Sequence, residues 1–165
     1  MEVLYALELD KLKMPGPPSD QEFVARPASE GALDQVVDWR IAYQYETNLT
    51  GTSHEERGTL TASLRQQVEA GDVWMLSDHE QLVSMTGLNA RLPTMVQLGG
   101  GWTPPAHRGN GYARSVIAEH LATLALAGVR KATLFTPVEN VSARRADDAL
   151  GFEVIGDYTI VLLSQ

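Results

Sequence analysis

The sequence predicts an α/β fold of the α+β kind, in which helices flank a mostly antiparallel sheet. Three strand-like stretches follow one another between residues 73 and 103, separated only by turns. Apolar residues recur at helical spacing both before and after these stretches. At 165 residues, of which 44% are hydrophobic, the chain has the length of one ordinary domain with its own core.

The composition narrows the class of protein. The formal net charge of −8 disfavours a surface that follows nucleic-acid phosphates, although an acidic field attracts cationic molecules such as amines. No apolar run approaches the length of a membrane span, and no secretory signal is recognisable at the N-terminus. With no cysteine there is neither a disulfide nor a thiol nucleophile. We therefore expect a cytoplasmic protein with no nucleic-acid or membrane partner.

The N-terminus predicts a strand and a linker. Residues 3–9 are short, apolar and partly alternating, and residues 14–19 contain three prolines and a glycine. We expect residues 1–20 to form this strand and its linker, and residues 21–165 to form the main domain. Residues 158–163 resemble the opening strand in character. Two interpretations stay open: the opening strand pads a sheet edge, or it is the last strand of something that once preceded it.

The first half of the main domain predicts one strand and two helices. The strand is expected at residues 23–27 and the first helix at 32–47, where Leu33, Val36, Val37, Ile41 and Tyr45 recur at helical intervals before Gly51. The second helix is expected at 54–70, with Leu60, Leu64 and Val68 at four-residue spacing and a stop at Gly71.

The second half predicts a meander followed by alternating helices and strands. The meander strands are expected at 73–77, 82–88 and 95–103, with turns at 78–81 and 89–94. One helical face, closed at Gly128, consists of Ala113, Val116, Ile117, Leu121 and Leu124. The remaining elements are a buried strand at 131–136, a helix at 141–150, and a terminal strand pair at 152–155 and 158–163.

The run from Leu98 to Arg114 carries the chemistry. A strand leads through a glycine-spaced turn directly into an amphipathic helix, so several backbone N–H groups and the positive end of the helix dipole point at one spot. This arrangement suits a pyrophosphate. Gly109 and Gly111 permit left-handed backbone angles and leave room for the phosphates. Ala113 keeps the first turn open, and Arg108 or Arg114 adds charge-assisted contacts.

Two other phosphate loops do not fit this run. A Walker loop needs Lys followed by Ser or Thr after its second glycine, whereas Tyr112 and Ala113 follow Gly111. A dinucleotide fingerprint needs a third glycine where this chain has Ser115 or Val116. The run instead matches the pattern Arg/Gln-x-x-Gly-x-Gly/Ala from Arg108 to Ala113, and it resembles the coenzyme A loop of the GNAT (GCN5-related) N-acetyltransferases.

The flanking sequence extends this resemblance. Residues 102–105 end the strand before the loop, and residues 140–152 follow at the interval the family uses. The resemblance is close over residues 73–163, and residues 39–43 with Glu46 look like the first helix of one GNAT branch. It implies a GNAT fold, with a mixed, splayed sheet whose strand ending at Thr103 diverges from the strand at 131–136.

The resemblance also implies acetyl-CoA as co-substrate, with the pantetheine arm between the two diverging strands. Backbone amides at 101–103 would bond the pantetheine and polarise the thioester carbonyl. The pyrophosphate would lie on the amides of 108–113, and Asn140 would contact the cofactor arm. The cofactor-binding residues expected are Gly101, Trp102, Thr103, Arg108, Gly109, Asn110, Gly111, Tyr112, Ala113, Arg114 and Asn140.

The acid and base of the reaction are less defined. An alkylamine has a pKa near about 10 and must lose a proton before it attacks. Many members of the family carry a glutamate where this chain has Gln97, and a tyrosine acid where it has Asp147. Glu46 is the candidate general base, with His79 or Glu80 as alternatives.

The expected activity is therefore transfer of an acetyl group from acetyl-CoA to a primary amine of a small molecule or protein, by direct attack in a ternary complex. Two alternatives stay open: a catalytically weak or inactive acyl-CoA-binding module, and a structural or interaction domain. The four histidines show no paired metal spacing, so no metal is expected. His120 is expected to pack or lie at the surface. The oligomeric state stays open, with a homodimer through the opening strand as one alternative.

Overall fold

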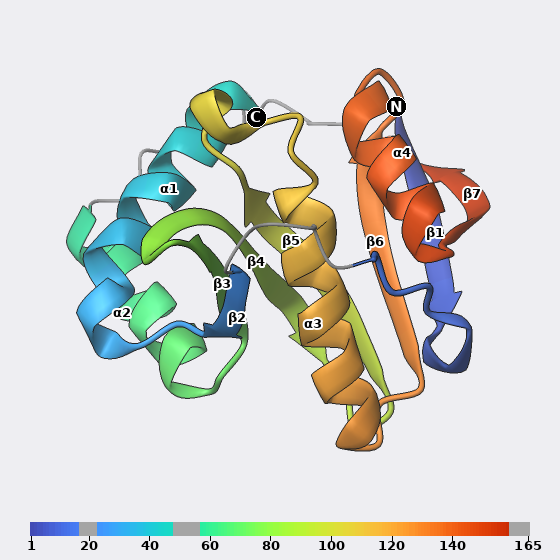
Figure 1. Ribbon diagram of the computed structural model, residues 1–165, viewed down its shortest axis with the longest axis horizontal. Helices are drawn as coiled ribbons and strands as arrows, with labels where there is room; N and C mark the ends of the chain where they lie inside the picture. The colour runs from blue at the N-terminus through green and yellow to red at the C-terminus, as the bar shows by residue number, and fades with distance from the viewer. Residues whose placement is uncertain (17–22, 48–56, 159–165) are drawn as a thin grey trace, which may run out of the picture.

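The computed structural model describes residues 1–16, 23–47 and 57–158, which fold around one seven-stranded sheet (Figure 1). In chain order the elements are β1 (Glu2–Glu8), the 3-10 turn η1 (Leu9–Lys11), β2 (Phe23–Pro27), η2 (Glu30–Ala32), α1 (Leu33–Glu46), α2 (Arg57–Glu69), β3 (Val73–Asp78), β4 (Gln81–Arg91), β5 (Met95–Trp102), η3 (Pro105–His107), α3 (Tyr112–Leu126), β6 (Lys131–Pro137), α4 (Val141–Leu150) and β7 (Glu153–Tyr158).

The sheet has the strand order β2-β3-β4-β5-β6-β1-β7, and every neighbouring pair is antiparallel except β5 and β6. The parallel pair joins only Met95–Gln97 to Lys131–Thr133. Beyond that point the two strands separate, as Figure 1 shows. The prediction of a mixed, mostly antiparallel and splayed sheet is confirmed.

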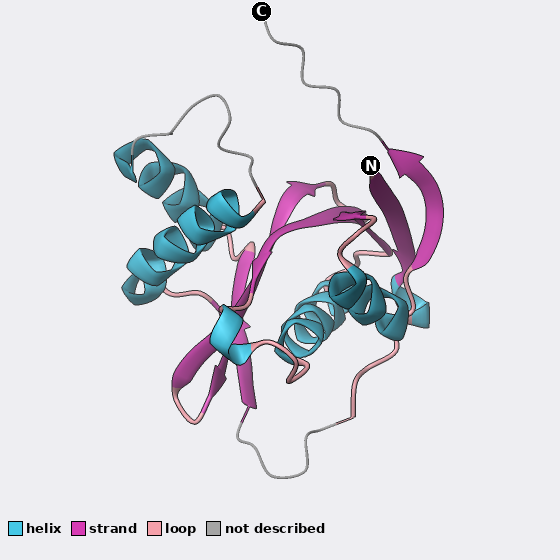
Figure 2. Ribbon diagram, turned by 90° about the horizontal axis from the view of Figure 1, so that it is seen from above, coloured by secondary structure: helices cyan, strands magenta, loops and turns pink. Residues whose placement is uncertain are grey.

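Helices cover both faces of the sheet, because the strands alternate their apolar side chains (Figure 2). On β3, Val73 and Met75 pack against α1 and α2, whereas Trp74 and Leu76 pack against α3. The residues spaced at helical intervals in α1 and α2 are buried against this first face: Leu33, Val36, Val37, Leu60, Leu64 and Val68. On the second face, α3 and α4 share a core with β1, β6 and the adjoining ends of β4 and β5.

The position of β1 corrects one expectation. The strand does not pad a sheet edge: it pairs with β6 along its whole length and with β7 on its other side. From Glu2 to Leu7 its residues alternate between half-buried and buried, and Tyr5 is fully buried. The Tyr5 hydroxyl accepts a hydrogen bond from Arg144 Nε of α4 at 3.1 Å, which fastens this helix to the strand.

Other differences concern boundaries. β4 runs to Arg91, through residues expected to form a turn. β7 runs to Tyr158, where a second terminal strand was expected to begin, and it pairs with β1. The rest of that expected strand, the start of the second predicted helix and the predicted stop at Gly51 lie outside the described residues. None of the described helices is long and apolar enough to cross a membrane.

Candidate active site

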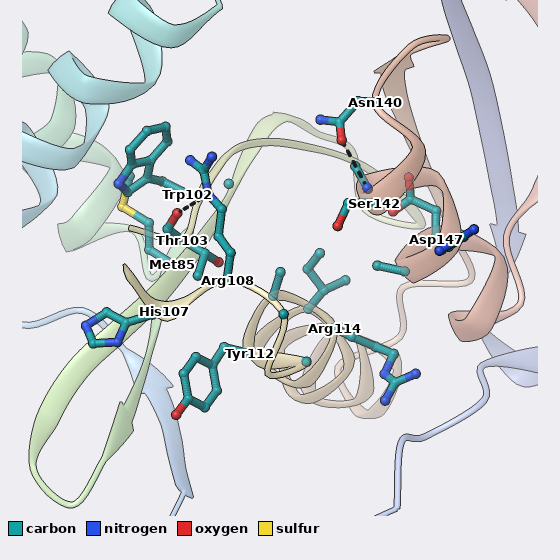
Figure 3. A pocket seen from close by; sticks show the side chains of 18 of the residues that line it. Met85, Trp102, Thr103, His107, Arg108, Tyr112, Arg114, Asn140, Ser142 and Asp147 are labelled. Atoms are coloured by element: carbon teal, nitrogen blue, oxygen red, sulfur yellow. Dashed lines mark hydrogen bonds between the residues drawn. The ribbon is translucent and has the colours of Figure 1, made fainter. Parts of the chain in front are cut away.

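A cleft of about 590 Å³ lies beside the ends of β5 and β6, where the two strands have separated (Figure 3). Its walls come from the C-terminal ends of α1 and β5, the loop that leads into α3, the first turn of α3, and α4. Met85, Trp102, Thr103 and Arg108 lie on one side of the cleft, and Asn140, Ser142 and Asp147 lie on the other. The separation of β5 and β6 thus leaves a cleft, whereas two strands that stayed paired along their whole length would leave no such space.

The first turn of α3 forms the floor of the cleft and is built to receive an anion. Its N-cap, Gly111, has φ +77° and carries no side chain, so no side chain of the described residues caps the helix. The first N–H groups of an α-helix have no partner inside the helix, and the dipole adds partial positive charge there. Gly109 also has a left-handed φ of +86°, and a Cβ there would meet open space.

A positive charge lies next to these amides. The guanidinium of Arg114 is 3.6 Å from the place a Cβ on Gly111 would occupy. The Nε of Arg114 is buried, and among the described residues it has no hydrogen-bond partner. A buried donor without a partner is unfavourable in an isolated chain, and an anion in the cleft would satisfy it.

The end of β5 is shaped by glycines. Gly100 has φ +67°, and a Cβ there would overlap the guanidinium of Arg40 from α1. A Cβ on Gly99 would overlap the side chain of Asn89, which the irregular pairing of β4 and β5 places over this strand. Two glycines therefore let α1 and β4 approach the strand closely. Ser84 Oγ lies 2.8 Å from Thr103 Oγ1 and fixes the point where the strand leaves the sheet.

The structure brings together most of the residues expected at the site. The lining includes Glu46 and every expected cofactor residue except Asn110, namely Gly101, Trp102, Thr103, Arg108, Gly109, Gly111, Tyr112, Ala113, Arg114 and Asn140. Asn110 lies outside the lining, and its Nδ2 donates to the carbonyl oxygen of His107 at 3.0 Å. Asn140 caps α4, because its Oδ1 accepts from the amide of Ala143 at 3.1 Å.

The alternative bases lie away from the cleft. His79 and Glu80 form the β3–β4 turn, where the Nδ1 of His79 is 2.6 Å from Asp78 Oδ1. Neither residue, nor Gln97, belongs to the lining. Glu46 does, at the C-terminal end of α1, and its carboxylate forms an ion pair with Arg108. Among the described residues no group of three or more His, Cys, Asp or Glu could hold a metal ion.

Asp147 is a buried acid in the wall of the cleft. It is 4% exposed, and its Oδ2 accepts a hydrogen bond from Thr136 Oγ1 of β6 at 2.9 Å. Burial raises the pKa of Asp147 to about 6, although the hydrogen bond from Thr136 lowers it. This carboxyl therefore changes its charge just below neutral pH, which suits a group that holds or releases a proton.

Part of the lining was not predicted from the sequence. Tyr43 lies one helical turn before Glu46 on α1, and a helical repeat from Glu46 would have indicated it. On α4 the lining consists of Ser142, Ala143, Arg145, Ala146 and Asp147. The motif shared with the GNAT enzymes indicates the place of this helix but not which of its faces meets the cleft.

Comparisons with known proteins agree with this geometry. The model of the acetyltransferase (GNAT) family matches residues 33–152. No curated protein matches the sequence.

Among solved structures, a GCN5-related N-acetyltransferase from Sphaerobacter thermophilus has a TM-score of 0.68 at 17% identity, over 93% of this chain and 48% of that one. A GNAT-family acetyltransferase from Colwellia psychrerythraea has a TM-score of 0.66 at 19% identity, over 93% and 52%. A predicted acetyltransferase with acetyl-CoA from Clostridium acetobutylicum has a TM-score of 0.64 at 15% identity, over 87% and 96%. The chain thus spans about half the length of the first two, and at these identities the likeness shows the fold.

Proposed function

The chain belongs to the acetyltransferase (GNAT) family, and on that premise we propose that it transfers an acetyl group from acetyl-CoA to a primary amine by direct attack in a ternary complex. The observation that carries the proposal is the uncapped first turn of α3 at the floor of the cleft, with left-handed Gly111 and the guanidinium of Arg114 beside it. These groups match the diphosphate of coenzyme A in charge and in hydrogen-bonding capacity.

The rest of the lining suits the reacting end of such a molecule. Bound acetyl-CoA would supply the acetyl group as an activated thioester. Backbone amides near residues 101–103, at the end of β5, would polarise the thioester carbonyl without the help of a particular side chain, and the presence of Gly101, Trp102 and Thr103 in the lining supports this role. Asn140 and the adjoining face of α4 would contact the cofactor arm from the opposite wall.

Two carboxyl groups of the lining are available for proton transfer. We assign the general base to Glu46, because it lies at the C-terminal end of α1 near Trp102 and Thr103 and is open to solvent. Asp147 is buried on the opposite wall, where its raised pKa lets it hold a proton in mildly acidic solution. A thiol has a pKa near about 8.5, so the leaving thiolate needs little help from an acid.

The proposed function is tested by two measurements on the wild-type chain. Calorimetric titration with acetyl-CoA should show binding at one site per chain. Incubation with acetyl-CoA and a panel of primary amines should then release free thiol. Binding without thiol release on any amine would overturn the transferase and leave an acyl-CoA-binding module. The absence of binding at millimolar acetyl-CoA would overturn both.

The Glu46→Gln variant tests the assignment of the base. We expect kcat/KM for an alkylamine to fall about a hundredfold at pH 7, the usual scale for the loss of a general base. The residual rate should rise tenfold per pH unit toward the amine pKa near about 10, because only the neutral amine then reacts. Steady-state rates from pH 6 to 10 measure both effects. A kcat/KM within twofold of wild type would assign the base elsewhere.

A further inference from the structure

The side chain of Arg108 turns away from the first turn of α3 and toward the end of α1 (Figure 3). Its Nη2 lies 2.7 Å from Glu46 Oε2, and its Nε donates to the carbonyl oxygen of Thr103 at 2.9 Å. The central carbon of the guanidinium lies 4.9 Å from the ring centroid of Trp102. A carboxylate, a carbonyl oxygen and an aromatic face are the three partners that proteins offer to an organic cation.

These three partners belong to the cleft itself. Glu46 ends α1, and Trp102 and Thr103 stand at the end of β5, where an acceptor would meet the thioester. An alkylammonium group carries three N–H donors and no acceptor, so it can use the same carboxylate, carbonyl and ring face. The guanidinium of Arg108 carries only donors, so it uses these partners in the same way.

We propose that Glu46, Thr103 and Trp102 form a cation subsite at the acceptor end of the cleft, that Arg108 fills this subsite in the structure, and that the acceptors are protonated alkylamines that displace it. The acetylation step rests on the proposed function, whereas the binding of the cation does not. The subsite disfavours arylamines, which are neutral at pH 7, and amines whose carboxylate would face Glu46.

The displacement is energetically easy. The side chains of Arg108 and Glu46 are 43% and 48% exposed, and ion pairs at such positions contribute little to stability. The guanidinium can therefore leave Glu46 for solvent when another cation arrives. Until then the guanidinium, which is tethered to the chain, competes with the acceptor for the subsite. Once Glu46 binds an ammonium group in its place, the carboxylate can accept the proton that the amine must lose before it attacks.

The position of Arg114 argues against the alternative in which Arg108 binds the phosphates. The guanidinium of Arg114 lies beside Gly111, and its buried Nε lacks a partner among the described residues. The donors of Arg108, in contrast, are held by Thr103 and Glu46 on the other side of the loop. The two arginines are thus assigned to opposite ends of the cleft, and Arg114→Ala is a matched control for Arg108→Ala.

The test is calorimetric titration with methylguanidinium and with n-butylammonium at pH 7, in the absence of acetyl-CoA. Arg108→Ala should bind both cations about three- to tenfold more tightly than wild type, because the tethered competitor is gone. Arg114→Ala should bind them as wild type does. The double variant Arg108→Ala/Glu46→Gln should bind the two cations no more tightly than wild type, because it lacks the carboxylate.

Steady-state kinetics complete the test. In Arg108→Ala the KM for n-butylamine should fall by the same factor, whereas the affinity for acetyl-CoA should fall only in Arg114→Ala. Cation binding no tighter than in wild type, or a tenfold loss of acetyl-CoA affinity in Arg108→Ala, would overturn the subsite and leave the proposed function standing. If no form of the chain binds acetyl-CoA, the proposed function fails, and the methylguanidinium titration still decides the subsite.

Discussion

Replacing Gly111 by valine should weaken acetyl-CoA binding at least about a hundredfold. A β-branched residue is unfavourable at φ +77° by about 1–2 kcal/mol, so the turn would move its amides to relieve the strain. The new side chain would also stand in the cleft where the first turn of α3 presents those amides. The nearest atom to the added Cβ is 3.6 Å away, an ordinary contact, so the domain should still fold. Calorimetric titration with acetyl-CoA measures the loss.

The matched control is Gly128→Val at the other end of the same helix. Gly128 has φ +101°, a Cβ there would meet open space, and the residue does not line the cleft. The control should lose about 1–2 kcal/mol of stability and bind acetyl-CoA as wild type does. Equal affinity in Gly111→Val and wild type would show that the diphosphate lies elsewhere.

A second large effect concerns the pH dependence of stability, in which two buried groups oppose each other. His120 on α3 is 1% exposed, its ring stacks on Trp74 with centroids 5.1 Å apart, and neither ring nitrogen has a hydrogen-bond partner among the described residues. Burial lowers the pKa of His120 from 6.5 to about 4, and the positive charge of Arg91 adds to this. Asp147 shifts the other way, to a pKa of about 6.

The signs of the two contributions follow from which state binds the proton. Below pH 6.5 the unfolded chain protonates His120 before the folded one does, so folding stability falls as the pH drops toward 4. Below pH 6 the folded chain protonates Asp147 before the unfolded one does, so this stability is present in acid and lost as the pH rises from 3.8 to 6. One pKa unit corresponds to about 1.4 kcal/mol, so each group contributes about 3 kcal/mol and the two largely cancel.

Single variants should expose the two contributions with opposite slopes. His120→Phe retains a ring against Trp74 and leaves the Asp147 contribution, so its free energy of unfolding should fall by about 3 kcal/mol from pH 4 to 6 relative to wild type. Asp147→Asn leaves the His120 contribution, and its free energy of unfolding should rise by about 3 kcal/mol from pH 4 to 6.5. Urea unfolding at each pH measures both. Parallel profiles for the two variants would contradict the assignment.

Much of the fold could be predicted from local sequence pattern. The meander, the helix that begins after Gly109 and Gly111, and the strand–helix order after it all depend on periodicity and on glycines at turns, which neighbouring residues determine. The floor of the cleft could be predicted for the same reason, because Gly109, Gly111 and the first turn of α3 lie next to one another in the chain.

The features that escaped prediction depend on partners distant in sequence. The place of β1 between β6 and β7 depends on pairing with strands at the opposite end of the chain. The direction of the Arg108 side chain depends on Glu46, sixty-two positions earlier in the chain. The buried contact between Asp147 and Thr136 depends on how α4 lies on β6. No local pattern encodes these pairings.

The position of β1 bears on how this protein assembles during synthesis. β1 precedes both of its neighbours in the sheet, which are translated after α3, with Glu2 opposite Pro137 and Tyr158. Until then the side chains of Val3, Tyr5 and Leu7, which are buried in the folded protein, lack the residues that cover them. Closure of such distant pairs is slow, so the domain acquires its complete sheet only after translation of β7, and β1 needs protection from aggregation until then.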